Sequence, residues 1–160
     1  MKKALILLMS LFAIVGLVAC GGETEDKEPK GNASQEKLES EYPYPSQEEK
    51  GYSKLIIDTP SGDSSDGNVP ILILEEDTLI TQIGYTIENF DGDKEVFFYI
   101  NKVFVEATQG GEMAQSSLDL SEWLLEPGTY EVVAAQFEDN DPNKEVVKLS
   151  KASYEIKTGS

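Results

Sequence analysis

The chain has 160 residues and a net charge of -17, with no histidine, no arginine, thirteen lysines and one cysteine. So acidic a surface repels nucleic acid and anionic lipid headgroups. Without histidine the usual proton shuttle near neutral pH is missing, and without arginine there is no bidentate group for carboxylate or phosphate. These absences exclude most common hydrolase and transferase designs, and they leave a mechanism that uses carboxylates alone.

Residues 1–19 have the pattern of a secretory signal. Lys2 and Lys3 form a positive start, and the residues that follow are apolar except for Ser10. A membrane-spanning helix needs about 20 apolar residues, so this run is short for a permanent span. Small residues close it before Cys20, as at a cleavage site. An uncleaved N-terminal anchor is the alternative interpretation.

The stretch Leu17-Val18-Ala19-Cys20 resembles a bacterial lipobox, and Cys20 is the only cysteine. The resemblance implies cleavage between Ala19 and Cys20, a diacylglyceryl group on the Cys20 thiol, and often a further acyl chain such as palmitate on the new amino group. Two chains suffice for stable anchoring. We therefore expect a small, Gram-positive type of lipoprotein at the outer face of the cell membrane. Processing of the cleaved leader into a signalling peptide is a further alternative.

Residues 20–52 are predicted to be a disordered acidic tether that carries the lipidated Cys20. Residues 21–52 hold nine acids and four lysines, a net charge of -5, and almost no aliphatic side chains. Such a segment cannot bury enough apolar surface to offset its ordering entropy. The stretch Tyr42-Pro43-Tyr44-Pro45 favours an extended backbone and reads as a stiff spacer, with a docking peptide as the alternative.

Residues 53–157 are rich in Ile, Val, Tyr and Phe and are interrupted by turn residues. A helical turn is expected over 121–126, and a bulge near Ser150 would bring the two halves of the last strand into phase. Seven or so short strands without a long helical period predict an all-β fold, an immunoglobulin-like β-sandwich. The expected strands are 54–58, 69–75, 79–89, 95–105, 115–120, 128–137 and 145–156.

The stretch Leu125-Glu126-Pro127-Gly128-Thr129-Tyr130 precedes an alternating strand. It resembles the tyrosine corner of immunoglobulin-like and fibronectin type III-like domains. The resemblance implies that Leu125, Gly128 and Tyr130 form the corner, and that Tyr130 turns inward and bonds to the backbone of the preceding turn. Val132 stands where antibody domains carry their second cysteine. An ordinary Pro-Gly turn in another sandwich or barrel is the alternative.

Two acidic loops are expected at the same end of such a sandwich, and both are candidate binding loops. Converging oxygen ligands could hold calcium, whereas hairpin chemistry explains the same residues without a ligand. No metal site is assigned. The candidate residues are Asn89, Asp91 and Asp93 in the first loop, and Glu138, Asp139 and Asp141 in the second.

These patterns predict a lipid-anchored surface lipoprotein that presents a non-catalytic binding or adhesion module. Its expected partners are the membrane, through diacylglyceryl-Cys20, and a protein or cell-wall component, with no nucleic acid and no cofactor. A carboxylate-dependent enzyme acting on the cell wall and a calcium-stabilised structural module are the alternatives.

Overall fold

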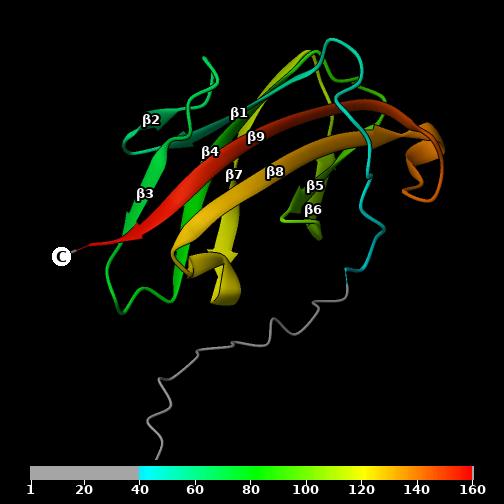
Figure 1. Ribbon diagram of the computed structural model, residues 1–160. Coiled ribbons are helices and arrows are strands. Elements are labelled where there is room, and N and C mark those ends of the chain that lie inside the picture. The colour runs from blue at the N-terminus through cyan, green and yellow to red at the C-terminus, as the bar shows by residue number, and fades with distance from the viewer. Residues whose placement is uncertain (1–39, 160) are drawn as a thin grey trace, which may run out of the picture. The chain divides into compact units, whose positions relative to one another are not determined.

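The computed structural model describes residues 40–159, which form two β-sheets packed face to face (Figure 1). Two short 3-10 helices, η1 and η2, interrupt the strands. The elements in chain order are β1 (Lys54–Thr59), β2 (Gly62–Asp63), β3 (Ile71–Leu74), β4 (Ile80–Glu88), β5 (Glu95–Ile100), β6 (Val103–Gln109), β7 (Met113–Ser121), η1 (Glu122–Leu125), β8 (Gly128–Phe137), η2 (Glu138–Asn140) and β9 (Val146–Thr158).

One sheet has four strands in the order β2-β1-β4-β7, and the other has five in the order β3-β9-β8-β5-β6. Only β3 and β9 pair in parallel. The chain passes repeatedly from one sheet to the other, so strands that are neighbours in sequence often lie in opposite layers. This is the predicted all-β, immunoglobulin-like sandwich.

The core between the sheets follows from side-chain alternation along the strands. In β4, Ile83 and Ile87 point inward and are fully buried. In β8, Tyr130, Val132 and Ala134 do the same from the opposite sheet. No disulfide joins the sheets at Val132, so packing alone holds the layers together here.

The five-stranded sheet is apolar on both faces. In β5, Val96 and Phe98 face the inter-sheet core, whereas Phe97 and Tyr99 belong to a second cluster on the outer face. Strand β5 is therefore buried on both sides. The second cluster, called the outer cluster below, comprises Phe97, Tyr99, Val133, Ala135, Phe137, Val146 and Leu149.

Residues 40–50, here named the strap, lie against the outer cluster. The Tyr42 ring meets Phe97 and Phe104 edge to face, with centroids 5.7 and 4.7 Å apart. The Tyr44 ring packs edge-on against Tyr99 at 5.8 Å. The sequence analysis placed the strap in the tether, but these contacts make it part of the folded body, which therefore begins before residue 53.

Polar contacts fasten the middle and the C-terminal end of the strap. The Tyr44 hydroxyl donates to a Glu131 carboxylate oxygen at 2.9 Å. Lys50 and Leu149 exchange two backbone hydrogen bonds of 2.9 and 3.0 Å. Figure 1 shows this segment in cyan, running up to β1. The strap was missed because its few apolar residues have no strand or helix period.

Two details of the predicted strands were wrong. Residues 95–105 were predicted as one strand, but the chain turns back at Asn101 and Lys102, between β5 and β6. Both turn residues adopt positive φ values, 45° and 75°. Asparagine tolerates that conformation, but no glycine marks the turn in the sequence. The bulge in the last hairpin lies at the Gln136/Phe137 step of the β8–β9 pairing, and Ser150 is in regular register. The apparent change of phase in β9 arises because the strand buries side chains on both faces.

The leader, Ala19 and Cys20 lie outside the described residues, as does the tether up to residue 39. Within residues 40–159, no helix is long and apolar enough to span a membrane.

Candidate functional site

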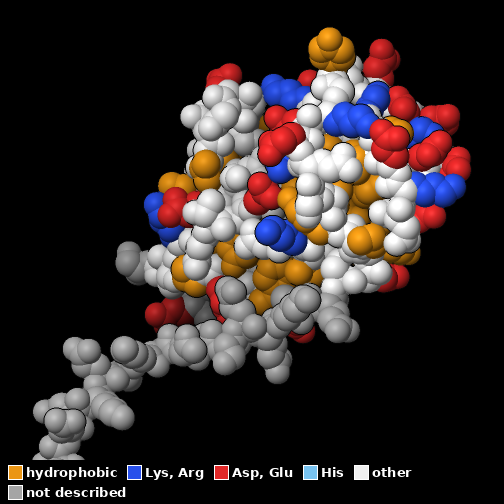
Figure 2. Space-filling model, turned by 45° about the vertical axis from the view of Figure 1, so that its right-hand side comes forward, with side chains coloured by type: hydrophobic (Ala, Val, Ile, Leu, Met, Phe, Trp, Pro, Cys, Tyr) orange, Lys and Arg blue, Asp and Glu red, His pale blue; other side chains and the backbone are white. Residues whose placement is uncertain are grey.

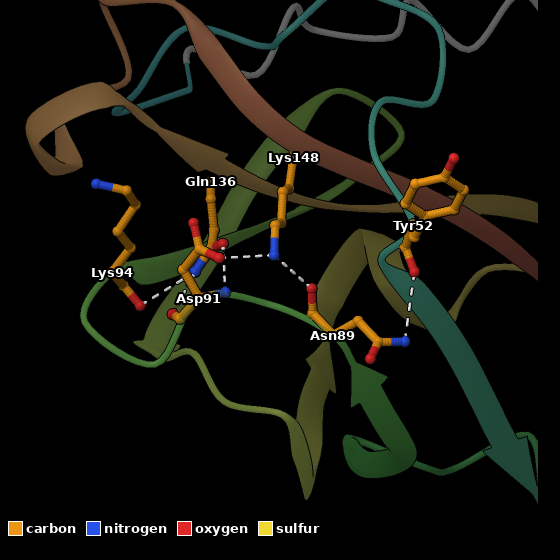
Figure 3. A network of polar contacts seen from close by, with 6 residues as sticks. All are labelled: Tyr52, Asn89, Asp91, Lys94, Gln136 and Lys148. Atoms are coloured by element: carbon orange, nitrogen blue, oxygen red, sulfur yellow. Dashed lines mark hydrogen bonds and ion pairs between the residues drawn. The ribbon is translucent and has the colours of Figure 1, made fainter.

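The two acidic loops meet at one end of the sandwich (Figure 3). The buried Gln136 side chain, near the end of β8, binds the first loop: its amide oxygen accepts the Asp91 N–H at 2.9 Å, and its amide nitrogen donates to the Asp91 and Lys94 carbonyls at 2.9 and 3.2 Å. The Asn140 side chain accepts the Glu95 N–H at 2.9 Å. Side-chain amide groups therefore tie the two loops together.

Lysines neutralise carboxylates in both loops. Lys148 Nζ lies 2.6 Å from Asp91 Oδ1 and donates to the Asn89 carbonyl at 2.7 Å. Lys144 Nζ lies 2.7 Å from Asp139 Oδ2, and this hydrogen bond lowers the pKa of Asp139.

The other loop candidates are placed differently. The Asn143 backbone N–H bonds to Asp141 and, with the Asn143 side-chain amide, lowers the pKa of Asp141. Asp93 and Glu138 are exposed to solvent. Among the residues that the structure describes, no three His, Cys, Asp or Glu side chains form a group suited to a metal ion. At this end the first loop carries the chain from β4 to β5 in the other sheet, and the second loop closes the β8–β9 hairpin.

The opposite end holds the tyrosine corner. The Tyr130 hydroxyl donates toward the carbonyls of Glu126 and Trp123, at 2.7 and 3.0 Å. Leu125 packs against the inter-sheet core, and Gly128 begins β8. The Tyr130 ring stacks on Tyr154 with centroids 5.2 Å apart. The corner thereby holds η1 and the turn after it in a fixed position.

A groove of about 560 Å³ lies at this end, and we name it the corner groove. It runs between the β3–β4 loop, the η1 segment through Pro127, and the last residues of β9. Leu74 and Ile156, which are 7% and 2% exposed, contribute apolar surface to its lining. Leu79 also lines the groove and is 84% exposed, and Ile80 next to it is 70% exposed. Such surface favours an apolar ligand group.

Four exposed glutamates also line the groove: Glu75, Glu76, Glu122 and Glu126. Within residues 40–159, all four ion pairs lie elsewhere and none involves these side chains. By contrast, the end that lies at the right of Figure 1 comes forward in Figure 2, where acidic and lysine side chains are interspersed. The corner groove therefore combines an apolar lining with four glutamates that form no ion pair within the described residues.

The sequence analysis did not find this groove, because its three walls are far apart in the chain. A local signal existed in Glu75-Glu76-Asp77 followed by Leu79 and Ile80, an apolar pair next to a turn.

No family model matches this chain, and no curated protein matches it in sequence. Two solved structures of a CARDB domain from Pyrococcus furiosus are similar in fold. The solution NMR structure is 14% identical, covers 65% of this chain and 94% of that domain, and has a TM-score of 0.38. The crystal structure, in complex with di-metal ions, is 14% identical, covers 83% of this chain and 100% of that domain, and also has a TM-score of 0.38. At this level neither likeness bears on function, and the fold assignment rests on the strand order described above.

Proposed function

We propose that this protein is a lipid-anchored binding module of the outer cell-membrane face, and that its corner groove holds a cationic amphipathic segment of a protein partner. The leader and the single Cys20 support the anchoring part of this proposal. The observation that carries the binding part is the groove itself, with its apolar lining and four glutamates outside any ion pair of the described body.

Charge and shape together select the partner chemistry. An aliphatic or aromatic side chain can bury against Leu74 and Ile156, while lysine or arginine groups flanking it reach the glutamates. Nucleic acid and anionic surfaces are repelled by the same charges. A neutral apolar ligand would leave the glutamates beside apolar groups without compensation, so a partner with both features fits best.

The enzymatic alternative finds less support. Glycoside hydrolysis by two carboxylates needs one with a raised pKa beside the substrate. Burial raises the pKa of Glu106, but Glu106 lies on β6, outside the groove. The groove glutamates are exposed to water, which suits charge recognition better than proton transfer.

Trp123, the only tryptophan, provides the assay. It lies in η1 next to residues that line the groove, so its fluorescence emission should change when a ligand binds in the groove. We would titrate the full chain with a lysine–leucine amphipathic peptide, and with a glutamate–leucine peptide as the control ligand. Saturable binding of the lysine peptide that weakens with added salt is expected.

The matched variants are Glu122→Gln with Glu126→Gln in the groove, and Glu112→Gln with Glu138→Gln at the far end. Both double variants remove two charges. Each exposed ion pair contributes roughly 0.2–1 kcal/mol, so losing two of them should weaken binding of the lysine peptide by about twofold to thirtyfold. Equal weakening by the two double variants would show attraction to net charge only and would refute the groove as the site.

A further inference from the structure

Strand β7 (yellow in Figure 1) is an edge strand of the four-stranded sheet, and it is the least protected edge of the sandwich. Edge strands expose unpaired backbone groups, and proteins usually blunt them with short strands, bulges, proline or lysine. Edge strand β2 has two residues, β3 has four, and the pairing of β6 contains a bulge. β7 has nine residues without proline or lysine, and its register with β4 is unbroken.

Serine side chains cap the other edges. In each case a serine hydroxyl oxygen accepts an N–H of an edge residue, and all four hydrogen bonds are between 2.7 and 3.0 Å long. The pairs are Ser150 with Leu55 and Ser64 with Ile57 on β1, Ser61 with Ile71 on β3, and Ser40 with Phe104 on β6. No side chain among residues 40–159 accepts an N–H of β7.

The outward backbone groups of β7 belong to its odd-numbered residues. In an antiparallel ladder, alternate residues bond to the partner strand. Asn89 donates to the Glu112 carbonyl, and the pairing continues in step through Ile87 and Ala114. Even-numbered residues of β7 therefore bond to β4, and the backbone of Gln115, Ser117 and their odd-numbered neighbours points away from the sheet.

We propose that β7 is the docking edge for a second copy of this chain, whose own β7 pairs with it antiparallel and joins two four-stranded sheets into one. A two-fold axis at Ser117 overlaps the whole of both strands. It places Gln115 opposite Asp119 of the second copy, an amide facing a carboxylate. Asp119 is the only charged residue in β7, and this register keeps the two copies of it from facing each other.

The net charge sets the conditions under which pairing occurs. Two copies at -17 repel each other, and salt screens that repulsion, with a Debye length of about 8 Å at physiological ionic strength. The dimeric fraction should therefore rise with salt, whereas binding of a cationic ligand in the corner groove should fall. This opposite response separates the two proposals in a single titration.

Single-cysteine crosslinking tests the register in the full chain carrying Cys20→Ser, dissolved in a mild detergent. Directly paired residues of this kind have Cα atoms about 5.5 Å apart, within the range of about 4.4–6.8 Å that a disulfide bridges. Ser117→Cys should therefore crosslink to itself under mild oxidation. Gln115→Cys should not, because its copies are offset by four residues, or about 13 Å. A mixture of Gln115→Cys and Asp119→Cys should crosslink.

A second measurement keeps the test independent of disulfide chemistry. Ser117→Lys brings two like charges together at the axis, so it should give a monomer in sedimentation equilibrium at a salt concentration where the parent chain is a dimer. Ser46→Lys adds the same charge at an exposed position of the strap, away from β7, and should stay dimeric. If Ser117→Cys links no faster than Gln115→Cys, or if the parent chain is monomeric at high salt, self-pairing at β7 is refuted. Capture of an extended strand from a different protein in its place would refute it equally.

Discussion

Removing the hydroxyl group from three buried tyrosines should change the free energy of unfolding in different directions. Tyr130 donates its hydroxyl proton to the corner carbonyls, whereas the hydroxyls of Tyr99 and Tyr154 are buried and have no hydrogen-bond partner among the described residues. Both of these rings are fully buried. Replacing each tyrosine with phenylalanine removes one oxygen and leaves the ring in place, so packing changes little across the series.

The expected magnitudes follow from the partners. Tyr130→Phe loses a hydrogen bond with a net value of about 1 kcal/mol and leaves a corner carbonyl without its donor. Tyr99→Phe and Tyr154→Phe remove a buried, unsatisfied hydroxyl, whose desolvation costs about 1–3 kcal/mol. For a body of about 120 residues, 1 kcal/mol corresponds to roughly 4 °C in melting temperature.

Urea unfolding followed by circular dichroism, together with thermal melts, measures all three variants on one scale. Tyr130→Phe should lower the free energy of unfolding by about 1 kcal/mol. The other two should raise it or leave it unchanged. A Tyr99→Phe variant that is destabilised as much as Tyr130→Phe would contradict the reasoning, because it would mean that the Tyr99 hydroxyl has a bonding partner in the native state.

Four further outcomes are expected. Tyr42→Ala should lower the free energy of unfolding by about 2 kcal/mol, because two edge-to-face aromatic contacts are lost. The control Tyr52→Ala changes a side chain that is 96% exposed, so it should leave the free energy of unfolding unchanged in the same urea titration. Gly110→Ala should cost about 1–3 kcal/mol by overpacking, since a Cβ there would lie 2.3 Å from the Asp91 carbonyl oxygen, whereas Gly92→Ala, with nothing nearer than 4.0 Å, should melt like the parent chain. The free energy of unfolding should fall as pH rises above about 10, because tyrosines in the unfolded chain ionise at their ordinary pKa. In the folded protein, burial and the hydrogen bond to Glu131 raise the pKa of Tyr44 to about 12. Absorbance at alkaline pH measures this ionisation. Calcium and a chelator should give the same melting temperature, because lysines already pair with one carboxylate in each loop, Asp91 and Asp139. A calcium-dependent rise of several degrees would restore the calcium-stabilised alternative.

Strands that bury one face were predictable from local pattern. In β4 and β8 the period of two is visible, since one face meets the core and the other meets solvent. The tyrosine corner from Leu125 to Tyr130 could also be predicted, because Pro127, Gly128 and Tyr130 form a motif within a few consecutive residues. The hairpin turn at Asn101 was not predicted because the residues on both sides of Asn101-Lys102 are densely apolar and no glycine or proline marks the turn. A strand that is buried on both faces shows no alternation.

The amino-acid sequence alone determined the all-β class, the acidic character and the lack of histidine and arginine, and from the sequence alone we predict lipid attachment at Cys20. Each of these depends on composition or on residues close together in the chain. Only the tertiary structure decided that residues 40–50 cover the outer cluster, that serines cap three edges and leave β7 open, and that three distant segments enclose the corner groove. The physical reason is that these features come from contacts between residues far apart in the chain, and a local pattern records only that a side chain is to be buried, not what will cover it.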